Sequence, residues 1–209
     1  MQIFVNGQLD PNESNVADDL CDVSVDLNFG RRQASGYETY LDGLIDEVAI
    51  YNRALTPEEI KAHAQRRPYA TYTSEVIDLT AVGSFNDISW TELGVATGDG
   101  ETPYDDTDLV AQWNFNENSG TTANNDAEGT SCGGTPSNCD GTLNGFSDTS
   151  GQDQVAGSGW TSDNGRWPRS APEALMFDGS DDYVSVTHDS ALDEPATNNQ
   201  ISVSAWIKP

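Results

Sequence analysis

Apolar and polar residues alternate along several short runs of this chain, which predicts β-strands that each bury one face. In Val23–Phe29 every second residue is apolar and the residues between are polar. The run Leu44–Ile50 is similar, with apolar residues on either side of an acidic pair. We predict further strands at Leu109–Phe115, Ala174–Phe177, Tyr183–Val186 and Ile201–Ile207.

One short helix is predicted after the strand at Leu44–Ile50. Thr56 can cap its N-terminus, Pro57 suits the first helical position, and Glu59 stands three residues after the cap. The helix should end near Gln65, because Pro68 follows shortly and cannot continue it. No other stretch has a comparable helical pattern, so the chain is predicted to be almost entirely β.

The middle of the chain differs from both ends. Residues 75–79 and 87–91 are short β-like runs, and residues 95–108 are rich in Gly, Asp, Thr and Pro. Such a polar stretch cannot build a core. We interpret 68–106 as a linker with a possible β-hairpin. Residues 118–170 have no regular period, which indicates elaborated surface loops.

Two groups of segments carry a resemblance to one family. The segment "GLIDEVAIYNRALTPEEI" (Gly43–Ile60) resembles the closing part of LamG-like, concanavalin A-like lectin/glucanase jelly rolls. The segment "IFVNGQL" (Ile3–Leu9) is similar to a hairpin of that family, with Asn6-Gly7 as the tight turn between its strands. The opening strands of the same family resemble "LVAQWNFNENSGTTANND" (Leu109–Asp126), "ALMFDGSDDYVSVTHDSAL" (Ala174–Leu192) and "ISVSAWIKP" (Ile201–Pro209).

The resemblance implies an all-β, antiparallel jelly-roll sandwich in two partial copies. Residues 1–67 would be the C-terminal part of one jelly roll, 68–106 the linker, and 107–209 the N-terminal part of another. The closing strands therefore precede the opening strands. The chain could be a window cut from a tandem array, a circular permutation, or a subunit that exchanges strands with its neighbours.

The family's central strands have no counterpart here, so joining the two parts would leave a sandwich with a hole in its middle. This disfavours a clean permutation, and we favour the window. The strand edges at Ile3–Val5 and Ile201–Ile207 would then be exposed and prone to association.

The strongly acidic composition limits the kinds of molecule that the chain is expected to bind. The chain has 35 acidic and nine basic residues, for a formal net charge of −26. Nucleic acids and anionic membranes need basic patches, so neither is expected as a partner. The acidity suits divalent cations, but we favour simple solvation of an extracellular or halophilic surface as its main cause. No apolar run approaches the ~20 residues of a transmembrane helix, so membrane insertion is not expected.

Two of the three cysteines flank a loop of small and polar residues, "CGGTPSNC". Such a loop cannot pack a core of its own, and a disulfide between Cys132 and Cys139 would clamp it. Cys21 is left over. It is either a small buried hydrophobic residue or pairs outside this chain.

Clustered carboxylates in "FDGSDDY" suggest a calcium site. Asp178, Asp181 and Asp182 lie within five positions, and Gly179 allows the backbone a close approach. Calcium binds six to eight oxygens, and a cation relieves the repulsion between clustered carboxylates. The alternative is an ordinary Asp-Gly turn with two solvated aspartates.

The family resemblance adds ligands to this site. It implies that a calcium ion bridges the loop and a carboxylate of the closing strand, and Asp46 occupies the matching position. Asn116 and Glu117, near the first strand of the second part, would supply further oxygens.

Tryptophans are the candidates for sugar stacking. Trp160 and Trp167 fall in the loop-rich region and are predicted to form a surface platform, although they could instead cover an edge of the sandwich. Trp113 and Trp206 alternate with apolar residues and are predicted core residues.

No catalytic constellation is evident. Glucanases of related fold place paired carboxylates on one strand, and no such spacing occurs here. We therefore predict a non-catalytic, extracellular or cell-surface repeat module for adhesion or surface assembly, stabilised by calcium. Its partners would be glycans or surface proteins, neighbouring repeats or identical chains. The alternatives are a filament subunit assembled by strand complementation and a carbohydrate-binding module of a larger hydrolase.

Overall fold

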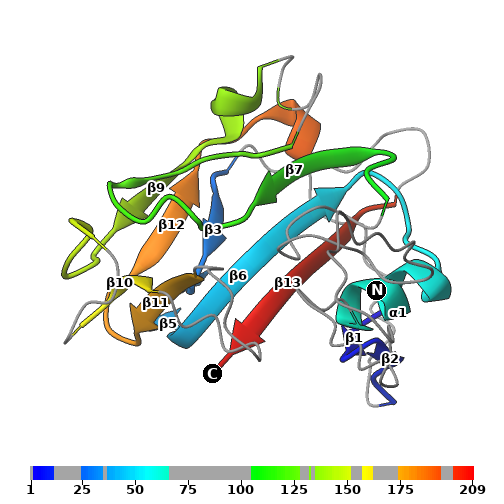
Figure 1. Cartoon of the computed structure of the whole chain (residues 1–209), viewed down its shortest axis with the longest axis horizontal. Helices are drawn as coiled ribbons and strands as arrows, with labels where there is room; N and C mark the ends of the chain where they lie inside the picture. Colours follow the sequence, from blue (N-terminus) through cyan, green and yellow to red (C-terminus); the bar gives the residue numbers. More distant parts are fainter. Residues whose placement is uncertain are drawn as a thin grey trace, which may run out of the picture.

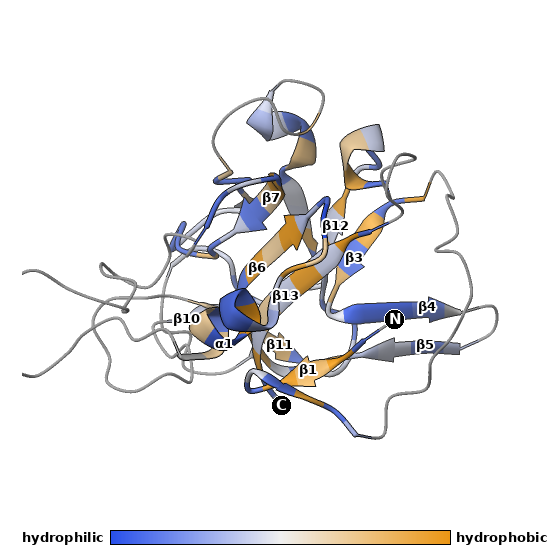
Figure 2. Ribbon diagram, turned by 90° about the vertical axis from the view of Figure 1, so that its right-hand side faces the viewer, coloured by the Kyte–Doolittle hydropathy of each residue, from blue (hydrophilic) through white to orange (hydrophobic). Residues whose placement is uncertain are grey.

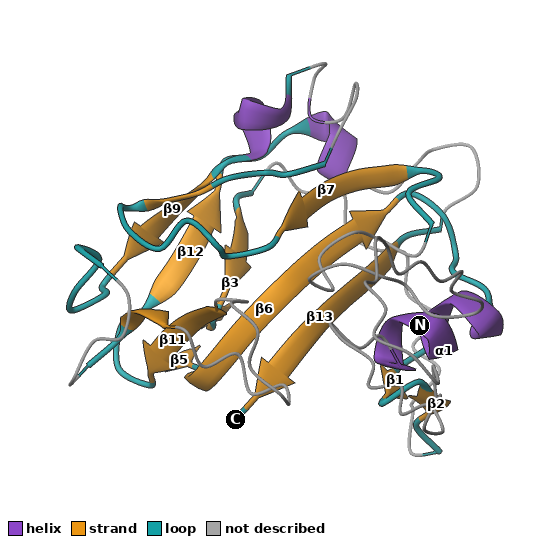
Figure 3. Cartoon of the chain, in the orientation of Figure 1, coloured by secondary structure: helices purple, strands orange, loops and turns teal. Residues whose placement is uncertain are grey.

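A computed structural model of the chain describes residues 2–11, 25–34, 37–65, 105–127, 132, 135–151, 157–161, 174–193 and 200–209 (Figure 1). Cys21, Trp167 and all but the last two residues of the predicted linker lie outside these ranges. Antiparallel strands dominate the described part, and α1 (Pro57–Gln65) is its one multi-turn α-helix (Figure 3). The prediction of an all-β antiparallel sandwich is confirmed.

The first sheet is organised around β6 (Asp42–Tyr51), its longest strand. One edge of β6 pairs with β13 (Ser202–Lys208). The other edge pairs with β11 (Ala174–Asp178) near the start of β6 and with β7 (Leu109–Trp113) near its end. β10 (Gly159–Thr161) extends the sheet beyond β11.

The second sheet has the strand order β3-β12-β9-β8. Its strands are β3 (Leu27–Phe29), β12 (Tyr183–Val186), β9 (Gly141–Asn144) and β8 (Thr122–Ala123). It lies behind the first sheet in Figure 1, and the two form a sandwich.

Smaller elements flank the sandwich. Two hairpins stand apart from the main sheets, β1 (Phe4–Val5) with β2 (Gln8–Leu9) and β4 (Arg31–Ala34) with β5 (Tyr37–Tyr40). Two 3₁₀ turns, η1 (Pro136–Cys139) and η2 (Ser190–Leu192), complete the described elements.

Both ends of the chain contribute to one hydrophobic core. Phe29 of β3 packs edge-on against Trp113 of β7, with ring centroids 4.8 Å apart. β6, which resembles a closing strand, pairs directly with β7, which resembles an opening strand. The described strands of the two predicted parts therefore interleave within one sandwich. The origin of the chain as a window from a tandem array stays a prediction.

A bulge in β6 changes which residues face this core. The register with β13 shifts by one residue between Ala49 and Asp46, and Glu47 has a positive φ of 49°. As a result Ile45 and Val48 both belong to the core cluster, whereas Leu44 is buried outside it. The predicted alternation, with Leu44 on the face of Val48, ignored this extra residue.

The helix after β6 forms as the sequence predicts. The Thr56 hydroxyl accepts a hydrogen bond from Glu59 N at 3.2 Å, and the Glu59 carboxylate accepts one from Thr56 N at 2.7 Å. This reciprocal pair is a capping box. Arg53 donates to both oxygens of Glu59, at 2.7 and 2.9 Å, and so ties the helix start to the end of β6.

The β1–β2 hairpin turns at Asn6-Gly7, whose φ angles of 51° and 74° fit the tight turn predicted there. An ideal Cβ on Gly7 would lie 2.9 Å from the Cβ of Ala64. The hairpin therefore packs closely on α1, and a larger residue at its turn would push it off the helix.

Candidate functional site

The loop between β11 and β12, Asp178–Asp182, gathers acidic side chains. Carboxylate oxygens of Asp178, Asp181 and Asp182 all lie within 4.8 Å of one another. Asp182 is fully buried, while the other two are exposed. We call this segment the aspartate loop. It offers hard oxygen ligands on one side to solvent and on the other to the protein interior.

Hydrogen bonds fold the aspartate loop tightly. Asp178 N donates to Asp182 Oδ2 at 2.8 Å, and Ser180 N donates to Asp178 Oδ1 at 2.9 Å. Gly179 has a φ of 78° and donates its N–H to Leu41 O at 2.9 Å. The left-handed conformation favours glycine at this position, as the sequence pattern suggested.

A fourth carboxylate comes from the first part of the chain. Asp42 of β6 is the cross-strand partner of Asp178. An ideal Cβ on Gly179 would lie only 3.0 Å from the Cβ of Asp42. Like charges directly opposite one another destabilise a sheet pair. Two facing aspartates beside two more therefore create a site that a cation would stabilise.

The electrostatic environment of Asp182 also favours a bound cation at this site. Burial raises the pKa of its carboxyl group, and the charge of Asp178 adds to the increase, while hydrogen bonds from Asp178 N and Ser158 oppose it. A divalent cation would offset both unfavourable effects, because it supplies the missing positive charge. Carboxylate oxygens are also the ligands that calcium prefers. The residues present thus fit calcium.

The structure does not bring Asp46 to the aspartate loop. Asp46 is four residues beyond Asp42 on β6, or about 13 Å along a strand. It is buried and lies opposite Trp206 of β13. This corrects the predicted ligand set: strand register makes Asp42, rather than Asp46, the neighbour of Asp178. The pairing of β6 with β11 shows that Asp42 takes the place predicted for Asp46, and the sequence does not show this pairing.

Trp206 itself departs from the core position predicted for it. Its partner on β6 is Asp46 rather than a core residue, and its side chain is only half-buried.

Glu117 lies with Asp126 and Asp140 in a second acidic group, which is separate from the aspartate loop. Burial raises the pKa of Glu117 to about 7, and the charges of Asp126 and Asp140 contribute, while a hydrogen bond from Asn124 N opposes the increase. Glu117 Oε2 is buried within the protein. Asn116 is exposed. The residues predicted to form one metal site are thus distributed over the aspartate loop, Asp46 on β6, and the segment of Asn116 and Glu117.

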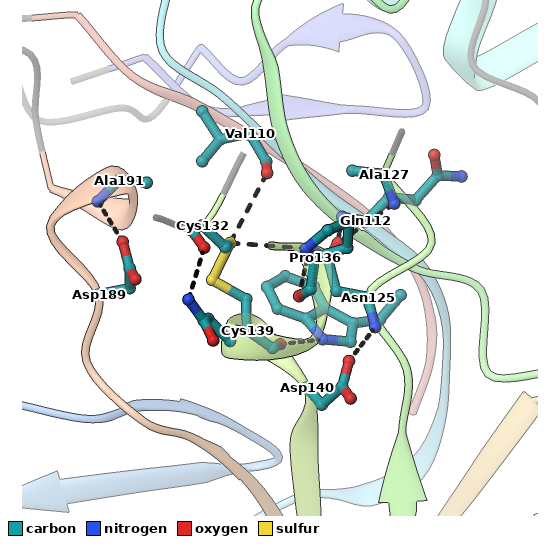
Figure 4. The surroundings of a disulfide bond; sticks show 12 residues. Val110, Gln112, Asn125, Ala127, Cys132, Pro136, Cys139, Asp140, Asp189 and Ala191 are labelled. Atoms are coloured by element: carbon teal, nitrogen blue, oxygen red, sulfur yellow. Dashed lines mark hydrogen bonds between the residues drawn. A yellow bond between two sulfur atoms is a disulfide. The ribbon is translucent and has the colours of Figure 1, made fainter. Parts of the chain in front are cut away.

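The predicted disulfide between Cys132 and Cys139 is confirmed, with a Cα–Cα distance of 5.7 Å (Figure 4). Asn125 lies beside it, where its Nδ2 donates to Pro136 O at 3.1 Å and its Oδ1 accepts from Gln112 N at 2.9 Å. Both cysteines are fully buried. The disulfide closes this loop, and the hydrogen bond from Trp113 Nε1 to Cys139 O holds the loop against β7.

The tryptophan platform is not formed as predicted. Trp160 is fully buried in the core, and its indole N–H donates to Gly120 O at 2.9 Å. Its ring cannot stack on a sugar, because β10 places it on the inner face of the first sheet. Trp113 is a core residue, as predicted, and its indole N–H donates to Cys139 O.

An exposed aromatic residue lies at the far end of the β4–β5 hairpin, whose base contacts the aspartate loop, on an element the sequence did not single out. Tyr37 begins β5 and has 79% of its surface exposed. The same hairpin carries Arg31, whose guanidinium lies 3.7 Å from the ring centroid of Tyr183. Tyr183 directly follows Asp182, and Leu41, at the base of the hairpin, accepts the hydrogen bond from Gly179.

Two further observations concern activity and location. Glu117 has a pKa raised to about 7 by burial, and its Oε2 is buried within the protein. In the part of the chain that the structure describes, no helix has the length and apolar character needed to cross a membrane.

Residues 1–61 match the family profile described as the concanavalin A-like lectin/glucanases superfamily. This segment contains β1 to β6 and the first half of α1, and the match confirms the resemblance of Ile3–Leu9 and Gly43–Ile60 to that family. No curated protein and no solved structure matches the chain. At a coarse level, the match supports a module for carbohydrate binding or adhesion.

Proposed function

We propose that this chain, whose residues 1–61 are those of a concanavalin A-like domain, is a non-catalytic extracellular module that uses calcium to hold a ligand-binding surface. The observation that carries the proposal is the aspartate loop, in which fully buried Asp182 lies with two exposed aspartates against Asp42. The ligands would be glycans or surface proteins.

Calcium would act here as a structural cation. Asp178, Asp181, Asp182 and Asp42 would hold it, and its charge would remove the repulsion among them. These residues connect β6, β11 and β12, and so belong to both sheets. An ion bound to them would therefore tie together elements from the two ends of the chain.

The β4–β5 hairpin is our candidate for the ligand contact. Tyr37 offers an exposed aromatic face, which suits stacking on a sugar ring. The hairpin joins the aspartate loop through the bond from Gly179 N to Leu41 O. Calcium would thus fix the position of Tyr37 indirectly, through the base of the hairpin.

The disulfide supports an extracellular location, because disulfides persist mainly in oxidising compartments. The net charge of −26 agrees with a protein that meets calcium at high concentration outside cells.

Metal removal tests the calcium site. We expect EDTA to lower the melting temperature of the wild-type chain and added calcium to restore it, since a ligand that binds only the folded state stabilises it by mass action. Asp182→Asn should abolish this response. Glu117→Gln is the matched control and should keep it, because Glu117 lies in the second acidic group. A wild-type chain that does not respond to EDTA would exclude the calcium site.

A glycan array tests the ligand surface. We expect retention of the wild-type chain in calcium, weaker retention in EDTA, and loss of retention for Tyr37→Ala with an unchanged melting temperature. Val5→Ala, on the distant β1–β2 hairpin, should bind like the wild type. Equal retention by Tyr37→Ala and the wild type would remove the β4–β5 hairpin from the proposal.

A further inference from the structure

Strands β3 and β6 belong to the first 65 residues, but their partners in the two main sheets all come from residues 105–209. β6 pairs with β7, β11 and β13, and β3 pairs with β12. Among the described strands, the first 65 residues pair with one another only in the two small hairpins. We call residues 1–65 the donor part and residues 105–209 the acceptor part.

Each part has an incomplete sheet without the other. β7, β11 and β13 all pair with β6, and among the described strands none of these three pairs with another of them. Figure 2 shows the apolar residues of β6 between β7 and β13. Ile45, Val48 and Ile50 of β6 belong to the core cluster, together with Trp113 and Leu175 of the acceptor part. The donor part therefore buries its longest strand against an acceptor part, since two-stranded hairpins alone are marginally stable in water.

Side-chain hydrogen bonds outside the sheets make this contact specific. The Ser202 hydroxyl donates to Arg53 O at 2.8 Å and accepts from Leu55 N at 3.0 Å. Arg53 Nε donates to Thr107 O at 3.0 Å. These bonds hold the segment after β6 against the acceptor part. The acceptor part thus recognises this donor part by more than an apolar strand.

The two parts are joined by residues 66–104, and this connection is long. It has 39 residues, which reach about 130 Å when fully extended. The ten residues of β6 span only about 33 Å. The connection therefore does not require a donor part to fill the acceptor part of its own chain.

We propose that copies of this chain exchange their donor parts, so that β3 and β6 of one copy complete the sheets of a second copy. The exchange is reciprocal and closes a dimer. The same residues meet in the same register as in the monomer, so no contact between the two parts is lost. Monomer and dimer then differ in which copies residues 66–104 connect, and mass action favours the dimer as the concentration rises.

The exchange also moves a ligand of the aspartate loop from one copy to the other, and this step rests on the proposed calcium site. Asp42 of β6 is the cross-strand partner of Asp178 of β11. In the dimer, each site therefore receives its Asp42 from the second copy. Exchange requires the donor part to leave first, which separates the two aspartates. Calcium binds the closed form and stabilises it against this opening, so it should slow exchange at least tenfold.

Cysteine trapping between full chains tests the exchange. Asn28 of β3 and Ser185 of β12 are cross-strand partners, on the face of the second sheet that points away from the core. In a Cys21→Ser background, one population carries Asn28→Cys and the other Ser185→Cys. The two are mixed at high protein concentration and in high salt, which screens the repulsion between acidic copies. After incubation, oxidation should yield a covalent heterodimer.

Two controls make the result specific. The double variant Asn28→Cys/Ser185→Cys should close the same disulfide within one chain at low concentration, which shows that these positions can be bridged. A mixture of Tyr37→Cys and Ser185→Cys copies should give heterodimer only at the level of random collisions. Tyr37 is 79% exposed, but its strand β5 pairs with β4 rather than with β12.

Parallel measurements in calcium and in EDTA separate this inference from the proposed function. Slower exchange in calcium supports the shared calcium site. Equal rates in both would refute the calcium step and leave the strand exchange supported. The strand exchange is overturned if the two single variants give no more heterodimer than the Tyr37→Cys mixture. It is also overturned if isotope-labelled and unlabelled wild-type copies form no mixed dimer at any concentration in native mass spectrometry.

Discussion

Glu59 provides a quantitative test of how α1 is held to the first sheet. Its carboxylate accepts hydrogen bonds from Arg53 and from Thr56 N. The bonds from Arg53 are the main reason why its pKa falls from 4.5 to about 2, and those from Thr56 add to the decrease, while burial opposes it. Glu59→Gln removes the charge and keeps nearly the same shape.

The shift from 4.5 to about 2 corresponds to roughly 3 kcal/mol of folding free energy. Little of this is lost to solvent screening, because the Glu59 side chain is only 10% exposed and that of Arg53 18%. We expect Glu59→Gln to cost about 2–3 kcal/mol at pH 7, since glutamine keeps part of the hydrogen bonding. For a chain of this size that is a decrease of roughly 4–12 °C in melting temperature.

The pH dependence has a definite sign. A carboxyl group with a lowered pKa stabilises the folded state above its unfolded pKa of about 4.5, and this stability is lost as the pH falls through about 2. The difference between wild type and Glu59→Gln should therefore be constant from pH 6 to 8 and shrink steadily below pH 4.5.

The assay is chemical denaturation followed by fluorescence at pH 7, 4 and 2.5. Glu58→Gln is the control, because Glu58 is the exposed neighbour in the same turn of α1 and should change stability by less than about 0.5 kcal/mol. The reasoning fails if Glu59→Gln matches Glu58→Gln at pH 7, or if its deficit is as large at pH 2.5 as at pH 7.

Two further predictions concern the disulfide and the second acidic group. Cys139→Ser opens a bridge with a sequence separation of seven and should lower the free energy of unfolding by about 2.5 kcal/mol relative to the oxidised wild type. The reduced wild type should lose a similar amount, and a variant within about 0.5 kcal/mol of the oxidised wild type would contradict this. Because burial raises the pKa of Glu117 from 4.5 to about 7, the contribution of this group to stability should be most favourable below pH 4.5 and become less favourable by up to about 3 kcal/mol as the pH rises from 4.5 through 7 in EDTA. Glu117→Gln should remove most of that decline, and an equal slope in both proteins would contradict the assignment.

Short-range patterns in the sequence determined most of the individual elements. The capping box at Thr56 and Glu59, the Asn6-Gly7 turn and the disulfide of Cys132 and Cys139 form as predicted. Each depends on residues only a few positions apart, whose chemistry constrains the local backbone directly. The family resemblance likewise rests on contiguous segments, and so it was visible without coordinates.

Long-range features required the folded chain. Asp42 replaces Asp46 beside Asp178 because of strand register, and Trp160 is buried because β10 joins the edge of the first sheet. The pairing of β6 with β7 brings both ends of the chain into one core. A local pattern shows that a strand has an apolar face, but not which strand will lie beside it or cover it.

Strand β13 illustrates the same limit. The alternation in Ile201–Ile207 predicted a strand with an apolar row, and that much the sequence by itself determined. Only the tertiary structure shows that Val203 and Ile207 of this row are exposed, to 63% and 59%, although their partners on β6 are buried in the core. Burial is a property of the whole packing arrangement, and residues far apart in the sequence supply it or withhold it.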